Sequence, residues 1–140
     1  MTKAIHPYVQ NIFTGEHSPP PIGSTLGMKI VMLDVDAGCI ETEYQGKPEF
    51  MNPAGHIQGG MLAAMLDDVT ALLTLASLEP EQYCSTLNLN ITYLRPAFPV
   101  TITGRAMRVR RGDRICNTRG ELWQNGKLVT TANAVLMVTR

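Results

Sequence analysis

Residues able to support hydrolytic chemistry gather in one stretch, NPAGHIQGGMLAAMLDDVTA, at positions 52–71. Gly59 and Gly60 begin a predicted helix that ends near residue 77 and is rich in Ala, Leu and Met. The N–H groups at a helix N-terminus are unpaired and electropositive, and glycine leaves them open to an anion or a developing oxyanion. Asp67 lies in the middle of this helix and could act as a base or a nucleophile. Each feature also has a purely structural interpretation: the glycines could serve a tight turn, and Asp67 could be a solvated acid.

The predicted helix has two unlike faces when its residues are placed at 100° intervals. An apolar stripe, which should pack on a sheet, consists of Leu62, Leu66, Val69, Leu73 and Ala76. The opposite face lacks Lys, Glu, Gln and Arg, and consists of Ala63, Ala64, Asp67, Thr70, Ala71 and Thr74. Because these residues are small, another body can approach closely. We therefore predict that Asp67 projects into a cleft where a ligand or a partner subunit arrives; the alternative is a face covered by a loop.

Gly59 and Asp67 are eight residues apart, which corresponds to about 12 Å along a helix axis. One small reacting group cannot touch both residues within a single chain. If both act on the same atom, the glycine end of one chain must meet the aspartate of another. The spacing therefore predicts a homodimer with roughly antiparallel helices, in which an isologous interface forms two equivalent sites.

The segments around this helix predict an α+β fold with a sheet of about six antiparallel strands. Two strands are expected before the helix, at 27–35 and 39–45, and Pro80 should end the helix. Four strands are expected after it, at 85–94, 100–110, 114–123 and 127–139. The last two of these are joined by Asn-Gly, which is the strongest short hairpin signal.

Residues 1–25 are predicted to form a peripheral N-terminal arm, and residues 26–140 the folded domain. The arm should begin as a short helix or turn, and its three consecutive prolines favour an extended linker. The N-terminal residues lack the apolar core of a signal peptide, and no apolar run approaches the ~20 residues of a membrane span. The three cysteines, Cys39, Cys84 and Cys116, lie far apart and lack the spacing of metal ligands. This usage predicts free thiols in a reducing cytoplasm.

Four positions resemble, in type and register, the motif of hotdog-fold acyl-CoA thioesterases, in particular the PaaI-like (phenylacetate-pathway) group: Asn52, Gly59, Gly60 and Asp67. In that family an Asn and a short loop precede His-Gly-Gly, and an acid follows eight residues after the first glycine. The segment TLNLNITYLRPA (86–97) is similar to the family's strand after the helix. The resemblance covers roughly residues 25–140. It implies a curled antiparallel sheet wrapped around one long central helix.

The resemblance also implies homodimers, often paired into homotetramers, with active sites between subunits. The Gly59 N–H would polarise the thioester carbonyl, and Asp67 of the other subunit would act as general base on water or as nucleophile. Asn52 would hold the carbonyl or the attacking water. Thr86 matches a position where relatives carry a Ser or Thr that orients water, and its neighbour Ser85 is a possible substitute. No metal is implied, and no cofactor beyond the coenzyme A of the substrate.

One position departs from the family pattern. Gln58 stands where the family usually has the His before the two glycines. It can donate a hydrogen bond to a carbonyl but cannot titrate. His56 lies two residues earlier, and is either an unrelated loop histidine or, with Gly60, part of the surface that receives the substrate.

Charge is concentrated in one other segment, RAMRVRRGDR (105–114), which holds five arginines. Its plain interpretation is an edge strand blunted by charge; alternatively, the phosphates of coenzyme A bind to Arg108, Arg110 and Arg111. Over the whole chain twelve basic and twelve acidic residues cancel. No overall field therefore attracts nucleic acid or a membrane, and basic residues do not interleave with aromatic ones.

These features predict an enzyme that hydrolyses an acyl-CoA thioester to the free acid and coenzyme A. The alternative is a catalytically silent hotdog module that binds an acyl-CoA or a partner protein, and the Gln58 departure keeps that alternative open. A hydratase of the same fold is less expected, because the central helix and its approach hold no Asp-x-Asn-x-x-His arrangement. Aromatic, short and medium acyl groups all fit the sequence.

Overall fold

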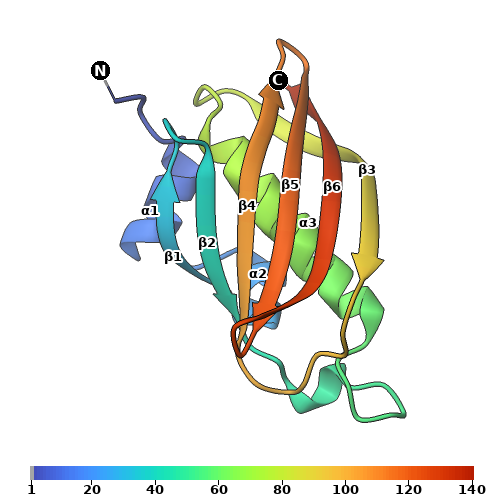
Figure 1. Ribbon diagram of the computed structural model, residues 1–140. Helices are drawn as coiled ribbons and strands as arrows, with labels where there is room; N and C mark the ends of the chain where they lie inside the picture. Colours follow the sequence, from blue (N-terminus) through green and yellow to red (C-terminus); the bar gives the residue numbers. More distant parts are fainter. Residues whose placement is uncertain (1) are drawn as a thin grey trace.

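Six strands form one antiparallel sheet in the computed structural model, which describes residues 2–140 (Figure 1). Their order across the sheet is β1-β2-β4-β5-β6-β3, so β1 and β3 are the edge strands. The strands are β1 (Lys29–Asp34), β2 (Cys39–Tyr44), β3 (Tyr83–Tyr93), β4 (Ile102–Arg111), β5 (Ile115–Gln124) and β6 (Lys127–Thr139). The described residues also contain α1 (Pro7–Thr14), α2 (Pro21–Leu26), α3 (Gly59–Ala76) and a 3-10 turn, η1 (Pro48–Phe50). The predicted fold class is confirmed.

The long helix α3 lies across one face of the curled sheet and contacts every strand from β2 to β6 (Figure 1). Its predicted apolar stripe is buried along its whole length, which confirms the helix-wheel analysis. The sheet allows a close approach at Gly120, where a Cβ atom would lie only 2.9 Å from Thr70 Cγ2. This tight packing fixes the rotation of α3, and so fixes the direction of each polar side chain on it.

Two threonines of α3 correct the predicted small face. Thr70 and Thr74 are buried, whereas the helix wheel placed them opposite the sheet. The Thr74 hydroxyl lies 3.1 Å from that of Thr118 on β5, and the Thr70 hydroxyl donates to the Leu66 carbonyl at 2.8 Å. The reason is the curl of the sheet, which encloses more of the helix circumference than a flat sheet would. The rest of the small face is half-buried: Ala63, Ala64, Asp67 and Ala71.

The N-terminal residues also differ from the prediction. A short helix, α1, forms as expected, but a second helix, α2, replaces the expected extended linker. Pro21 is the first residue of α2, where proline's fixed φ and missing N–H are tolerated. Val9 of α1 and Leu26 of α2 are fully buried in the main core, and the His6 N–H donates to the Ala76 carbonyl at the end of α3. The segment is therefore part of the core rather than peripheral.

The hairpins follow the predicted turns. Asn125 and Gly126 join β5 to β6 with φ values of 53° and 73°, the left-handed backbone that a two-residue turn of this kind requires.

Strand β3 pairs along one side with β6 and leaves its other side unpaired. Most of its residues are exposed, including Tyr83, Leu87 and Tyr93. An unpaired strand of 11 residues with exposed apolar side chains is a surface suited to pairing with another strand.

The helix α3 itself corrects one expectation about apolar runs. Its 18 residues have a mean hydropathy of 1.4 and would be long and apolar enough, by length and composition alone, to cross a membrane. In the structure its apolar surface is instead packed against the sheet, and the helix is the centre of the hydrophobic core. The composition of α3 is therefore explained by its burial.

Candidate active site

The N-terminus of α3 presents two unpaired donors. Gly59 and Gly60 are its first two residues, and Gln58 precedes them as an N-cap whose side chain makes no capping hydrogen bond. The Met61 and Leu62 N–H groups bond back to the Gln58 carbonyl, whereas those of Gly59 and Gly60 find no acceptor within residues 2–140. The two donors predicted from the sequence are thus available to a ligand.

An open groove lies beside this N-terminus and is called the Gly59 groove below. Its walls come from the loop before α3, the first turn of α3 and the end of β3, and consist of Asn52, His56, Ile57, Gly59, Leu62, Tyr93, Leu94, Arg95, Pro96 and Ala97. The structure therefore brings together Asn52, His56 and Gly59. It leaves Gln58 and Gly60 exposed next to the groove rather than lining it.

Asn52 shapes the loop that precedes the helix. Its side-chain oxygen accepts hydrogen bonds from the N–H groups of Ala54 (3.0 Å) and His56 (3.1 Å), an Asx-type turn. Only the side-chain amide N–H₂ of Asn52 is therefore left to donate to a ligand. The His56 ring packs edge-on against Phe98, with ring centroids 5.2 Å apart, and faces the groove.

Tyr93 is a groove residue that sequence reasoning missed. Its hydroxyl donates to the Gly59 carbonyl at 2.8 Å, although the two residues are 34 positions apart. A Cβ atom on Gly59 would lie 3.3 Å from the Tyr93 ring, whereas one on Gly60 would meet nothing within 4 Å. Gly59 is therefore glycine because an aromatic ring covers it, and not because its backbone needs a left-handed φ. The sequence signals only that Tyr93 ends a strand.

Alanine substitution should affect the stability of the fold differently at Gly59 and Gly60. In a helix, replacing glycine by alanine stabilises by about 0.5–1 kcal/mol, so Gly60→Ala should show that gain. Gly59→Ala should show no gain or a loss, because its methyl group must displace the Tyr93 ring and disturb the Tyr93–Gly59 hydrogen bond. Urea unfolding of both variants at one protein concentration measures the difference. Equal gains for the two variants would show that Tyr93 does not constrain Gly59.

Asp67 meets Thr86 at the middle of α3. The Thr86 hydroxyl donates to Asp67 Oδ1 at 2.7 Å, and Asp67 is half-buried. The structure therefore brings together these two predicted residues. Ser85 lies on the other face of β3, because side chains alternate along a strand and Ser85 pairs with Met137 while Thr86 pairs with the buried Leu136. Ser85 is not a substitute for Thr86 in this geometry.

Cys84 is close to the same aspartate but is not a nucleophile. The pKa of its thiol is raised to about 11, mainly by burial and to a smaller extent by the neighbouring Cys116 and Asp67. Its sulfur lies 3.7 Å from the Ala71 carbonyl. Burial also raises the pKa of the Cys116 thiol. Because the thiolate is the reactive form, neither thiol is suited to nucleophilic attack.

Asp67 and Gly59 do not meet within one chain. Asp67 is not among the residues of the Gly59 groove, and the helix separates the two by about 12 Å. Strand β3 runs beside both, because Thr86 touches Asp67 and Tyr93 touches Gly59. The free N–H donors and the acid thus lie along one strand, and the outer side of that strand is unpaired.

A second acid, Asp68, points elsewhere. Its Oδ2 accepts a hydrogen bond of 2.7 Å from the hydroxyl of Tyr44, a fully buried residue of β2. Burial raises the pKa of Asp68 to about 6; the Tyr44 hydrogen bond opposes this rise, and the charge of Asp67 adds to it. Burial also raises the pKa of Tyr44 well above its ordinary value. Sequence reasoning assigned Asp68 no role, because its partner lies 24 positions away on another element.

Asp68 should make the stability of the fold depend on pH. Its pKa is near 6 in the folded chain and near 4 when unfolded, so stability falls as pH rises from about 4 to about 6, by about 2–3 kcal/mol. Asp68→Asn keeps an acceptor for Tyr44 and removes the titration. Urea unfolding at pH 4 and pH 7 should therefore show the variant gaining about 2–3 kcal/mol relative to the natural chain at the higher pH. A constant difference between the two chains at both pH values would contradict this.

The arginine-rich segment is mostly engaged within the fold. Arg108 donates to the Val35 and Asp36 carbonyls at 3.2 and 3.3 Å and holds the β1–β2 turn. Arg111 donates to the Gly112 carbonyl, and its Nε atom is buried without a partner. Arg110 is exposed and makes no hydrogen bond or ion pair with the described residues. Of the three predicted phosphate ligands, Arg110 is the one that the fold leaves free.

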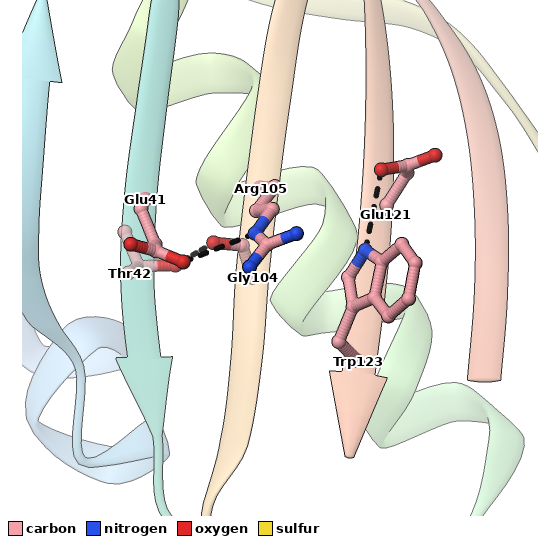
Figure 2. Close-up of polar contacts among 6 residues, drawn as sticks. All are labelled: Glu41, Thr42, Gly104, Arg105, Glu121 and Trp123. Atoms are coloured by element: carbon pink, nitrogen blue, oxygen red, sulfur yellow. Dashed lines mark hydrogen bonds and ion pairs between the residues drawn. The ribbon is translucent and has the colours of Figure 1, made fainter. Parts of the chain in front are cut away.

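Charged side chains on the outer face of the sheet form ion pairs and hydrogen bonds with one another (Figure 2). Arg105 forms an ion pair with Glu41 at 3.0 Å, and its guanidinium lies 5.2 Å from the centre of the Trp123 ring. The Trp123 N–H donates to Glu121 at 3.2 Å, as Figure 2 shows. These contacts are exposed to solvent and mutually neutralised, which is the pattern of a solvated sheet surface. Residues 2–140 contain no group of three or more His, Cys, Asp or Glu arranged to hold a metal ion.

Comparisons with known proteins agree with this fold. The family model of the Thioesterase superfamily matches residues 54–131. The chain is 50% identical to a phenylacetic acid degradation-related protein of Ralstonia eutropha JMP134, over 93% of this chain and 98% of that one, with a TM-score of 0.90. No curated protein sequence matches the chain.

More distant structures share the fold. A thioesterase from Haemophilus influenzae is 22% identical, with a TM-score of 0.82 over 94% of this chain and 90% of that one. The PaaI protein of the phenylacetic acid degradation operon of E. coli is 17% identical, with a TM-score of 0.83 over 98% of this chain and 97% of that one. The fold and the site thus define a hotdog protein of the PaaI-like kind. The chain belongs to the Thioesterase superfamily, which supports thioester hydrolysis as its general activity.

Proposed function

We propose that this protein hydrolyses an acyl-CoA thioester to the free acid and coenzyme A, at sites shared by two copies of the chain. One observation carries the proposal: the free donors at Gly59 and the Asp67–Thr86 pair lie along one helix, about 12 Å apart, beside a strand whose outer side is unpaired. Two chains related by a two-fold axis would bring the donors of each next to the acid of the other.

Strand β3 supplies a register for this dimer. Residues directly opposite one another in an antiparallel pair point to the same face of the sheet. On β3, Thr86 and Tyr93 point toward α3, whereas Asn88, Asn90 and Thr92 are exposed, and Leu87 is the extra residue of a bulge. A two-fold axis at Asn90 places Asn90 opposite Asn90 of the second copy. Asn88 is then opposite Thr92 and, past the bulge, Thr86 is opposite Tyr93.

This register assembles a complete site. Thr86 accompanies Asp67, and Tyr93 accompanies Gly59, so opposing these two residues of β3 sets the base of one copy against the donors of the other. The Gly59 N–H would bind the thioester carbonyl oxygen and stabilise the oxyanion that forms on attack. Asp67 would take a proton from the attacking water, or attack the carbonyl carbon itself. When water attacks, the C–S bond breaks and the coenzyme A sulfur leaves with the proton that Asp67 took from the water. When Asp67 attacks, the sulfur leaves as the thiolate, and a water then hydrolyses the mixed anhydride to the free acid and restores the Asp67 carboxylate, while the released proton passes to the thiolate.

Neighbouring groups would orient the reactants. Thr86 donates to Asp67 Oδ1 and so fixes the carboxylate, leaving Oδ2 for the water or the substrate. The free amide of Asn52 faces the groove and can hold the carbonyl or the water. Arg110, exposed beside the β4–β5 turn, is the candidate ligand for a coenzyme A phosphate. Coenzyme A remains part of the substrate in this scheme, and a cytoplasmic location is part of the proposal.

Asp67→Asn tests the chemical role. The amide keeps an acceptor for Thr86 but cannot take a proton or form an anhydride. We therefore expect kcat to fall about 10²–10⁴-fold, the order of magnitude expected for loss of a general base or nucleophile. Release of coenzyme A thiol from a panel of aromatic, short and medium acyl-CoAs measures turnover. Asp113→Asn, an exposed acid in the β4–β5 turn, is the matched control and should keep full activity.

The same panel decides between the two functional hypotheses. Undiminished hydrolysis by Asp67→Asn would contradict the proposed mechanism. Tight binding of an acyl-CoA without turnover by the natural chain would favour the catalytically silent binding module. Calorimetry with the same acyl-CoAs, run in parallel with the thiol assay, distinguishes these outcomes.

A cysteine at the proposed two-fold axis tests the register. Opposed residues of an antiparallel pair have Cα atoms about 4.5–5.5 Å apart, within the range that a disulfide needs. Asn90→Cys should therefore form a covalent dimer under mild oxidation, visible on a non-reducing gel. Asn88→Cys is the matched control, because its two copies would lie about 13 Å apart, four residues along the strand. Cross-linking of Asn88→Cys instead, or a monomer by sedimentation for the natural chain, would overturn this dimer.

A further inference from the structure

The start of α3 lacks the side chains that usually hold a helix N-terminus in place. Gln58 is the N-cap residue, and its side chain makes no capping hydrogen bond. The next two residues, Gly59 and Gly60, have no side chains, and glycine is the residue whose backbone is least restricted. The direction of their two free N–H groups therefore depends on what holds the peptide units to which these groups belong.

Each of these two peptide units is held at its carbonyl. The N–H of Gly59 belongs to the peptide unit of the Gln58 carbonyl, which accepts hydrogen bonds of 2.9 and 3.2 Å from the following residues of the helix. The N–H of Gly60 belongs to the peptide unit of the Gly59 carbonyl, which accepts from the Tyr93 hydroxyl at 2.8 Å. Because a peptide unit is planar and trans, holding its C=O also fixes the direction of its N–H. The helix thus holds the first donor, and a strand residue adds a hold on the second.

The position of Tyr93 is itself well fixed. Strand β3 ends at Tyr93, beside the first turn of α3 (Figure 1). Tyr93 pairs there with Thr130, a fully buried residue of β6, so its backbone is anchored in the sheet. A Cβ atom on Gly59 would lie 3.3 Å from Tyr93 Cζ and 3.4 Å from its hydroxyl oxygen. A larger residue at position 59 would therefore push the hydroxyl away from the carbonyl.

Stability does not account for this contact. The Tyr93 side chain is 49% exposed in the single chain, and a hydrogen bond that water can replace adds little net stability. Its local effect on the peptide unit is more specific. A carbonyl that accepts a hydrogen bond polarises its own peptide unit, which makes the N–H of that unit a stronger donor. The unit concerned carries the free N–H of Gly60, and open space around Gly60 leaves room for a substrate.

We propose that Tyr93 is a positioning residue for the reaction: its hydroxyl holds and polarises the Gly59–Gly60 peptide unit, so that the Gly60 N–H joins the Gly59 N–H in binding the oxyanion. The inference rests on the proposed function. Free N–H groups of consecutive residues at a helix N-terminus point the same way and can share one anionic oxygen. In the register proposed above, Tyr93 is opposite Thr86 of the second copy, which accompanies the acid of that copy. The held peptide unit therefore faces the base across the interface.

Tyr93→Phe tests the inference in the intact chain, because it removes the hydroxyl and keeps the ring over Gly59. For an acyl-CoA that the natural chain hydrolyses, kcat should fall about 3–30-fold with KM unchanged, less than the cost of removing an oxyanion donor outright. Tyr83→Phe is the matched control and should keep the natural kcat. Tyr83 is an exposed tyrosine at the start of the same strand, and its hydroxyl makes no hydrogen bond with the described residues.

The two kinetic constants separate positioning from other roles of this hydroxyl. A raised KM at an unchanged kcat would mean that the hydroxyl contacts the substrate rather than the peptide unit. A lower urea midpoint with the natural kcat would mean that it only supports the fold. Either result would overturn the inference.

Amide NMR of the chain without substrate tests the same contact independently of turnover. In Tyr93→Phe the Gly60 amide proton should move upfield, because its peptide unit loses a polarising hydrogen bond. The Gly59 amide proton should move much less, because the helix still holds its peptide unit. Equal shifts at the two glycines, or none at Gly60, would contradict the inference and leave Tyr93 a wall of the groove. Failure of the proposed function would appear differently, as undiminished activity of Asp67→Asn.

Discussion

The packing of α3 into the curl of the sheet is the constraint on which the rest of the structure depends. Small residues on the sheet, with Gly120 against Thr70 and Leu66, let the helix approach closely and lock its rotation. Because side chains leave a helix at fixed angular intervals, that rotation determines where every polar group on α3 points. It turns Gly59 toward Tyr93, Asp67 toward Thr86, and Asp68 toward Tyr44. An apolar helix could fill the same space without any of these contacts.

Strand β3 connects this helix to a second molecule. It touches the polar groups of α3 at two places through side chains on its inner face, while its outer edge has no partner. Natural proteins rarely leave a long strand edge of this kind open, because it invites pairing with other chains. Here the open edge lies between the two halves of the proposed site. The same strand would thus set both the interface and the alignment of the reacting groups across it.

Local patterns in the sequence were sufficient for the elements, and insufficient for contacts between distant elements. Alternating apolar residues, the Asn125-Gly126 turn and the stripe on α3 are local signals, and they predicted the sheet, its hairpins and the central helix. The pairing of Thr86 with Asp67 was anticipated only through the family resemblance. Tyr93 over Gly59 depends on strand register and sheet curl, which no local pattern encodes. The burial of Leu26 of α2 in the main core likewise depends on packing between distant elements, which no local pattern encodes.

The Gln58 departure changes which titratable groups lie near the proposed chemistry. Relatives usually carry a titratable His directly before the two glycines, whereas Gln58 has no proton to exchange at that position. The titratable groups left near the proposed chemistry are His56 in the groove and the two acids of α3. Of these, Asp68 combines burial, a dedicated donor and a carboxylate neighbour. Because burial raises the pKa of Asp68, the fold should be less stable above pH 6 than near pH 4.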